Sequence, residues 1–161
     1  MLKDVSFSPP LPEEKIDISR QEHAGKCSKI HVLLDRTYPM FSASAPGSGN
    51  SPITGMLWDG IDAGKTHLIV FGTKDLDGNN HKAVQAAVRQ FLPDATVVDT
   101  RAHDWNSDPY SKGVWCVSKP GQLPHALGAL QAPHGRIFFA SGDWASAWRG
   151  FIDGAIERGI V

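Results

Sequence analysis

The sequence predicts an α+β domain of mixed α/β character, because segments with strand patterns alternate with segments that have helical spacing. Several short runs are β-branched and apolar and are bounded by turn-forming residues, as strands are. In residues 82–92 apolar pairs recur every four residues, which is the pattern of one helix face. The chain has no internal repeat and no low-complexity segment.

The first half of the chain predicts an extended connector followed by strands. Residues 6–12 contain three prolines, which fix the backbone and keep the preceding residues out of the helical region. A short charged stretch, residues 13–20, comes next. Turn-forming residues 44–52 then interrupt the strands. The predicted strands of this half cover residues 29–34, 53–58 and 67–71.

The second half predicts a helix, a strand, a long loop and a closing strand-turn-helix. Pro93 stops the helix of residues 82–92, and residues 95–98 form the next strand. Residues 102–121 are rich in Trp, Gly, Ser and Pro and predict an irregular loop, which is where functional side chains often lie. A buried-type strand at 136–140 leads through an acidic turn to a helix that begins near residue 151.

Composition and charge exclude several classes of protein. The 161 residues suit one domain, and sixteen basic against seventeen acidic residues, without a Lys/Arg cluster, make nucleic acid an unexpected partner. No apolar stretch approaches the ~18 residues of a membrane span, and the first ten residues lack the apolar core of a secretory signal. We therefore expect a cytoplasmic protein in which Cys27 and Cys116 are free thiols.

Three motifs suggest chemistry that their spacing does not support. Residues 60–66 resemble a phosphate-binding loop, but only three residues separate the two glycines and a strand pattern follows instead of a helix. The seven histidines lack the paired spacing of a zinc site. No Gly-x-Ser-x-Gly elbow marks a nucleophilic serine, and Gly47 to Gly49 lies in a proline-bounded loop.

The acidic turn Ser141-Gly142-Asp143 is the most informative position. A carboxylate near a helix start suits a ligand hydroxyl, while the free N–H groups of the helix face an electron-rich atom. The alternative is an ordinary Asp N-cap. Trp105, Trp115 and Trp144 lie in or beside the predicted loops and favour a planar aromatic ligand.

Residues 135–156 resemble the carboxy-terminal flavin motif of the monoamine oxidase family, which contains a similar strand, acidic turn and Trp-x-Gly-aromatic helix start. Upstream, Phe7 to Pro12 and Gly25 to Lys29 are similar to the segment leading to that family's flavin-facing lysine. The resemblance covers essentially the whole chain. It implies a single unit with a substrate-domain-like part over about residues 1–130 and an FAD-motif part over about residues 131–161.

The resemblance implies three catalytic residues. Lys29 corresponds to the lysine that holds a water near the flavin, where a cation stabilises developing negative charge, and Lys26 is the competing candidate. Trp115 and Phe151 correspond to the two walls of an aromatic cage that orients the amine. Because the walls are tyrosines in many relatives, Trp115 and Phe151 imply a more apolar pocket.

The resemblance also implies a set of FAD-binding residues. Asp143 corresponds to an acidic residue at the ribityl or phosphate part of FAD, and the backbone of Ile152 to a donor toward the pyrimidine ring. The other implied cofactor contacts are Trp105 in the pocket loop, Gly142 in the turn, and Trp144 and Ala145 beside the cofactor. Val114 occupies the position of the cysteine that anchors flavin covalently in animal relatives, so we expect non-covalent FAD.

The implied activity is FAD-dependent oxidation of a small amine, but the 161 residues lack the Gly-x-Gly-x-x-Gly turn that receives the FAD pyrophosphate. The chain alone is therefore expected to be inactive, as a fragment, a degenerate product or a subunit that needs a separate FAD-binding polypeptide. The alternatives are a non-catalytic module that binds a partner or itself, and a small-molecule-binding module. A large exposed apolar patch favours a missing partner.

Overall fold

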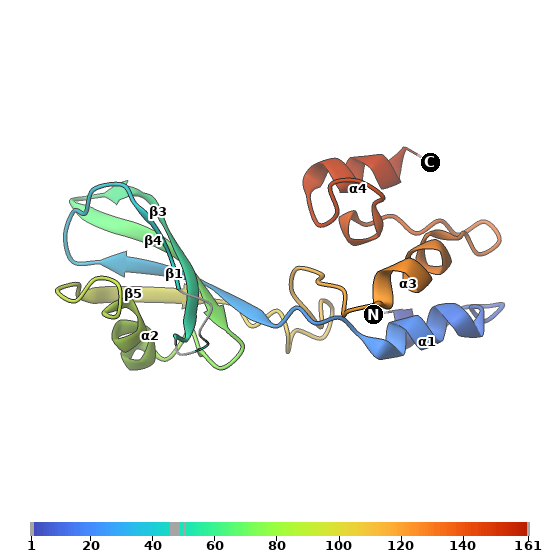
Figure 1. Cartoon of the computed structure of the whole chain (residues 1–161), viewed down its shortest axis with the longest axis horizontal. Coiled ribbons are helices and arrows are strands. Elements are labelled where there is room, and N and C mark those ends of the chain that lie inside the picture. The colour runs from blue at the N-terminus through green and yellow to red at the C-terminus, as the bar shows by residue number, and fades with distance from the viewer. Residues whose placement is uncertain (1, 46–48, 50, 161) are drawn as a thin grey trace. The chain divides into compact units, whose positions relative to one another are not determined.

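A computed structural model describes residues 2–45, 49 and 51–160. The chain forms two compact units, one made of residues 1–25 together with 108–161, the other of Lys26–Ser107 (Figure 1). The boundary expected near residue 130 falls inside the first of these units and stays a prediction.

The unit Lys26–Ser107 is built on a five-stranded antiparallel sheet with the strand order β2-β3-β4-β1-β5. The strands and the helix α2 have these bounds: β1 Cys27–Leu34, β2 Ser42–Ser44, β3 Ile53–Asp62, β4 Lys65–Thr73, α2 His81–Val88 and β5 Val97–Ala102.

The core of this unit lies between α2 and one face of the sheet. In β1 the alternate residues Ile30 and Val32 are buried, and they pair across the sheet with Val70 and Leu68 of β4. Val84 of α2 belongs to the same buried cluster. The period-2 alternation of β1 therefore leaves the intervening residues, Lys29 among them, on the other face of the sheet.

The tight turn between β3 and β4 explains the segment that resembles a phosphate-binding loop. Asp62 pairs with Lys65, so the hairpin loop is only Ala63 and Gly64. Both have positive φ, 47° and 75°, as a type I′ turn requires. Residues 60–66 are thus a β-hairpin and not a phosphate site.

The other unit contains α1 (Glu13–Gln21), α3 (Gln122–Gln131) and α4 (Ile152–Gly159), with short 3-10 turns η1 (Leu2–Asp4) and η2 (Gly142–Trp144). Helices α1 and α3 pack together, and α4 packs against η2.

Most of the predicted elements are present, and the fold class is confirmed as helices combined with an antiparallel sheet. The helix predicted at 82–92 ends earlier, at Val88, and the strand predicted at 95–98 is β5, which begins at Val97. The sequence patterns did not predict α1, β2 or α3. The loop at 44–52 contains residues 46–48 and 50, which lie outside the described residues.

The predicted buried strand at 136–140 is wrong. The segment makes one isolated bridge, between His134 and Ile137, and pairs with no strand among the described residues. Ile137 and Phe138 are 40% and 67% exposed, and only Phe139 is buried. An apolar run forms a strand only where another strand satisfies its backbone groups, and this unit offers none in the described part of the chain.

Replacement of Gly64 by alanine should destabilise the hairpin. The added methyl group meets no atom within 4 Å, so the cost of about 1 kcal/mol comes from the positive φ alone. Ala63→Asn, which suits a type I′ turn, should have the opposite sign. Urea unfolding followed by circular dichroism measures both; equal midpoints for Gly64→Ala and the wild type would contradict the turn assignment.

Candidate functional site

Three exposed aromatic rings cluster around the start of α4. The rings of Trp115 and Phe151 have centroids 5.2 Å apart and meet edge to face at 88°. Trp148 meets Phe151 in the same manner, at 6.1 Å and 89°. About half or more of each side chain is accessible to solvent, with 57% of Trp115, 49% of Phe151 and 68% of Trp148 exposed. The two predicted cage walls are therefore neighbours, and each has a free apolar surface.

Gly150 allows Trp115 to take this position. A Cβ on Gly150 would lie 1.9 Å from Nε1 of Trp115, which no side chain tolerates, and the residue has a φ of +80°. The Gly150 N–H donates to the Gly142 carbonyl oxygen at 2.8 Å. One glycine thus links the indole of the long loop to the acidic turn.

The acidic turn is held by its own backbone and by α3. The Asp143 N–H donates to the Ser141 hydroxyl at 3.2 Å, and the Trp144 N–H donates to the Ser141 carbonyl. The side-chain amide of Gln131 in α3 donates a hydrogen bond to the Trp144 carbonyl oxygen at 2.7 Å. The N-cap of η2 is Ser141 and that of α4 is Phe151, so the alternative interpretation of Asp143 as an N-cap is wrong.

A carboxylate fixes the segment between the turn and α4. Glu157 accepts hydrogen bonds from the N–H groups of Ser146, at 2.8 Å, and Ala147, at 3.0 Å. These bonds hold the pKa of the Glu157 carboxyl below its usual 4.5. The first turn of α4 has no side-chain cap, so the N–H of Ile152 belongs to a group of donors that a helix leaves without internal partners.

Two predicted site residues belong to the other compact unit. Lys29 is exposed on the face of the sheet opposite the core, and its cross-strand neighbour is Phe71. Trp105 is 48% exposed and stacks edge to face on His103, with ring centroids 4.3 Å apart. The structure therefore groups Trp115 and Phe151 with the turn and Ile152, whereas Lys29 and Trp105 are carried by Lys26–Ser107.

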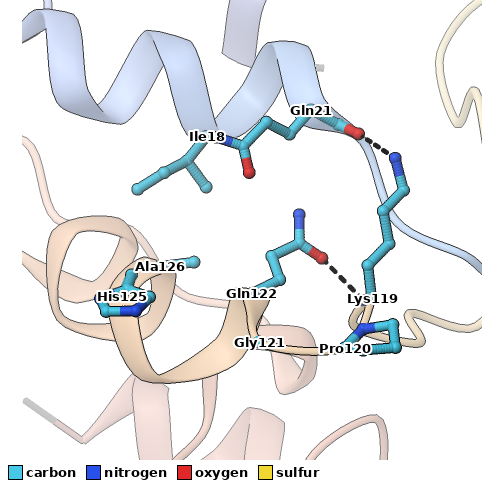
Figure 2. A pocket seen from close by; sticks show the side chains of 8 residues that line it. All are labelled: Ile18, Gln21, Lys119, Pro120, Gly121, Gln122, His125 and Ala126. Atoms are coloured by element: carbon cyan, nitrogen blue, oxygen red, sulfur yellow. Dashed lines mark hydrogen bonds between the residues drawn. The ribbon is translucent and has the colours of Figure 1, made fainter.

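A hollow of about 400 Å³ lies between α1 and α3 (Figure 2). Hydrogen bonds join three of its lining residues: the Lys119 ammonium group donates to the Gln21 carbonyl oxygen, and the Lys119 backbone N–H donates to the Gln122 side-chain oxygen. No predicted site residue lines it; the lining residues are Ile18, Gln21, Lys119, Pro120, Gly121, Gln122, His125 and Ala126.

Within residues 2–45, 49 and 51–160, no group of three or more His, Cys, Asp or Glu side chains is placed to hold a metal ion. In the same residues no helix has the length and apolarity to cross a membrane. Cys27 and Cys116 are free thiols.

Comparison with known proteins settles the family. A family model described as flavin containing amine oxidoreductase matches residues 1–160. The chain belongs to this family of flavin-containing amine oxidoreductases. A flavin is therefore the cofactor of the family to which these residues belong.

Two relatives are named as dehydrogenases of pseudooxynicotine and of nicotine. The chain is 42% identical over 159 residues to a pseudooxynicotine dehydrogenase of Pseudomonas sp., covering 97% of this chain and 32% of the relative. It is 30% identical to a nicotine dehydrogenase of Pseudomonas putida, covering 98% and 33%. The chain thus spans about one third of the length of these relatives.

Solved structures agree on the fold. Wild-type putrescine oxidase bound to putrescine superposes with a TM-score of 0.78 at 18% identity, covering 96% of this chain and 38% of the other. At that identity the likeness supports the fold alone.

Gly150, Glu157, Trp148 and Gln131 are site residues that the sequence analysis did not single out. Gly150 and Trp148 lie inside the Trp-x-Gly-aromatic motif, so the motif marked the position without indicating the contact. Glu157 and Gln131 lie 10 or more residues from the groups they bind, and no local pattern identifies such partners.

Gly150→Ala should displace Trp115 and destabilise the unit of residues 1–25 and 108–161 by at least about 2 kcal/mol, because steric conflict adds to the cost of a positive φ. Gly128→Ala is the matched control: nothing lies within 4 Å of its Cβ, and it should stabilise α3 by about 1 kcal/mol. Thermal unfolding and the indole N–H signal of Trp115 measure the two effects. Equal behaviour of the two variants would contradict the contact.

Stability of the 146–147 segment should fall at acid pH because of Glu157. A carboxyl whose pKa is lowered by folding adds stability above its unfolded value, near 4.5, and loses it as the pH falls through the lower folded value. The protection of the Ser146 and Ala147 amides against exchange, relative to an unstructured peptide at the same pH, should therefore decrease below pH 4.5 in the wild type. In Glu157→Gln the same amides should be less protected at neutral pH, and their protection should no longer change with pH; the wild-type pH profile of protection in that variant would exclude Glu157 as the cause.

Proposed function

We propose that this chain forms the amine-facing side of an FAD-dependent amine oxidase or dehydrogenase. The observation that carries the proposal is the exposed pair of aromatic rings, Trp115 and Phe151, held beside the turn 141–145 by Gly150. Membership of the flavin-containing amine oxidoreductase family supports the same reaction class.

The fit of a flavin to these residues rests on their surfaces. The rings around the start of α4 offer planar apolar area, the uncapped first turn of α4 offers N–H donors at Ile152, and Asp143 adds a half-buried carboxylate in the turn. Such a set suits a ligand with a flat ring system and polar edges. The proposed cofactor contacts in the turn are Gly142, Asp143 and Trp144, and the contact implied for Trp105 stays a prediction.

The FAD, when bound, supplies a hydride acceptor for the carbon beside the amine nitrogen. In the proposed reaction that carbon loses a hydride, the nitrogen lone pair forms the C=N bond of an imine, and water hydrolyses the imine to a carbonyl compound and an amine. No protein nucleophile is needed. Trp115 and Phe151 orient the amine and exclude water from its apolar part, and Lys29 holds a water where oxygen is reduced.

We propose an amine with an aromatic ring as the substrate. Indole and phenyl side chains at the two wall positions give a more apolar surface than a pair of tyrosines would, and they interact well with a second aromatic system. The names of the two dehydrogenases, for pseudooxynicotine and for nicotine, support the same class.

The rest of the flavin site is proposed to come from a dinucleotide-binding segment outside these 161 residues, on the same polypeptide or on another. Large apolar side chains are exposed along the last quarter of the chain, and such surfaces mark interaction sites. Those more than half exposed are Phe138, Trp148, Ile152, Ile156 and Ile160. A non-catalytic module that binds a partner or itself through this surface is the alternative.

Flavin attachment is proposed to be non-covalent. Val114 stands where animal relatives carry the attaching cysteine. Burial, and then the charge of Asp143, raise the pKa of the Cys116 thiol, which disfavours the thiolate that attachment requires.

The proposal is tested with a reconstituted mixture of this chain, FAD and the separately expressed dinucleotide-binding half of a related amine oxidase. Nicotine added without oxygen should remove the visible flavin absorbance. Trp115→Ala should slow that reduction about tenfold or more, whereas Tyr110→Ala, which removes an aromatic ring that is 84% exposed, should not.

Lys29→Met should leave reduction unchanged and slow reoxidation by oxygen about tenfold. Bound flavin that no amine reduces would refute the proposed reaction.

A further inference from the structure

Lys15 is a buried charge that the proposed reaction does not use. It lies in the first turn of α1, and only 2% of its surface is exposed. Burial lowers the pKa of its ammonium group, and no carboxylate pairs with it among the residues that the structure describes. A lysine buried without a counter-ion is costly, so the groups that surround it must compensate by other means.

Two kinds of partner stabilise this ammonium group. It donates hydrogen bonds to the carbonyl oxygens of Leu130, at 3.3 Å, and Ala132. Leu130 lies in the last turn of α3 and Ala132 is the C-cap residue, so the ammonium group lies at the negative end of that helix. It also lies over the ring of Phe139, 3.8 Å from the ring centroid, in cation–π geometry. Lys15 therefore joins α1, the end of α3 and the segment that precedes the acidic turn.

Both sets of partners reach Trp144. The ring of Phe139 meets the indole of Trp144 edge to face, with centroids 5.9 Å apart. Gln131, between the two carbonyls that Lys15 binds, donates its side-chain amide to the Trp144 carbonyl at 2.7 Å and to the Ser146 hydroxyl at 3.2 Å. The side chain and the backbone of Trp144 are thus held by groups that Lys15 fixes.

We propose that Lys15 is a positioning residue for the flavin: its ammonium group fixes Phe139 and the end of α3, and through them sets the position of the turn 141–145. The flavin part of this inference rests on the proposed function, in which Gly142, Asp143 and Trp144 contact the cofactor. Lys15 itself touches neither the turn nor the cofactor. The charge of Lys15 acts through the rings of Phe139 and Trp144 and through the end of α3.

Three variants separate positioning from plain structural support. Lys15→Met keeps the length and apolar stem of the side chain but removes the charge and the donors, whereas Lys15→Arg keeps both. Arg20→Met is the matched control, because it removes a cation from the same helix that is exposed and paired with Glu13 and Asp17.

The first measurement is amide exchange together with the indole N–H signal of Trp144, assigned with Trp144→Phe, on the 161-residue chain. In Lys15→Met the amides of Asp143 to Ala145 should exchange about tenfold faster relative to those of α4, and the Trp144 signal should shift. Lys15→Arg and Arg20→Met should match the wild type. Equal acceleration over the whole unit, or an unchanged turn, would overturn the proposal.

The second measurement is flavin affinity in the reconstituted mixture. Lys15→Met should raise the dissociation constant of FAD about tenfold, and Lys15→Arg should restore it. A dissociation constant within twofold of the wild type in Lys15→Met would overturn the positioning role. If the wild-type mixture binds no flavin, the proposed function fails, and the exchange data still decide whether Lys15 sets the turn.

Discussion

The contact between Trp115 and Gly150 is the constraint on which the candidate site depends. The indole occupies the space that a side chain at residue 150 would fill, and the backbone of Gly150 binds that of Gly142. The loop before α3 is thereby held to the segment that starts α4, and Phe151 follows directly in the chain. Without this approach the two predicted cage walls would be unrelated aromatic residues in separate loops. Their edge-to-face packing is a consequence of the glycine between them.

The same unit combines a well-fixed interior with large apolar side chains on its surface. Lys15, Gln131 and Glu157 each bind backbone groups of distant segments and hold the turn and its flanks in place. Outside, Ile152, Ile156 and other large apolar residues of the last quarter of the chain are exposed. Exposed apolar area on a fixed framework is the arrangement expected of a surface that binds something. This combination supports the proposal that the dinucleotide-binding part of the flavin site comes from outside these 161 residues.

Patterns with a local cause were predictable from the sequence. The buried alternation at Ile30 and Val32 and the apolar pairs of α2 follow directly from strand and helix periodicity. The strand predicted at 136–140 is absent because an apolar run shows only the capacity to pair, and pairing depends on a strand from elsewhere. Helix α1 was hidden by its charged surface, and α3 by a proline and a glycine within it. The buried position of Lys15 has no sequence signal, because a lysine near a helix start is ordinarily solvated.

We propose that the flavin site is shared between this chain and a dinucleotide-binding segment outside it. This sharing is measured by titrating FAD into the purified chain and following the visible absorbance, first with the chain alone and then with the separately expressed dinucleotide-binding half of a related oxidase. We expect no tight binding by the chain alone and a perturbed flavin spectrum in the mixture. Tight binding by the chain alone, or no binding in the mixture, would contradict it.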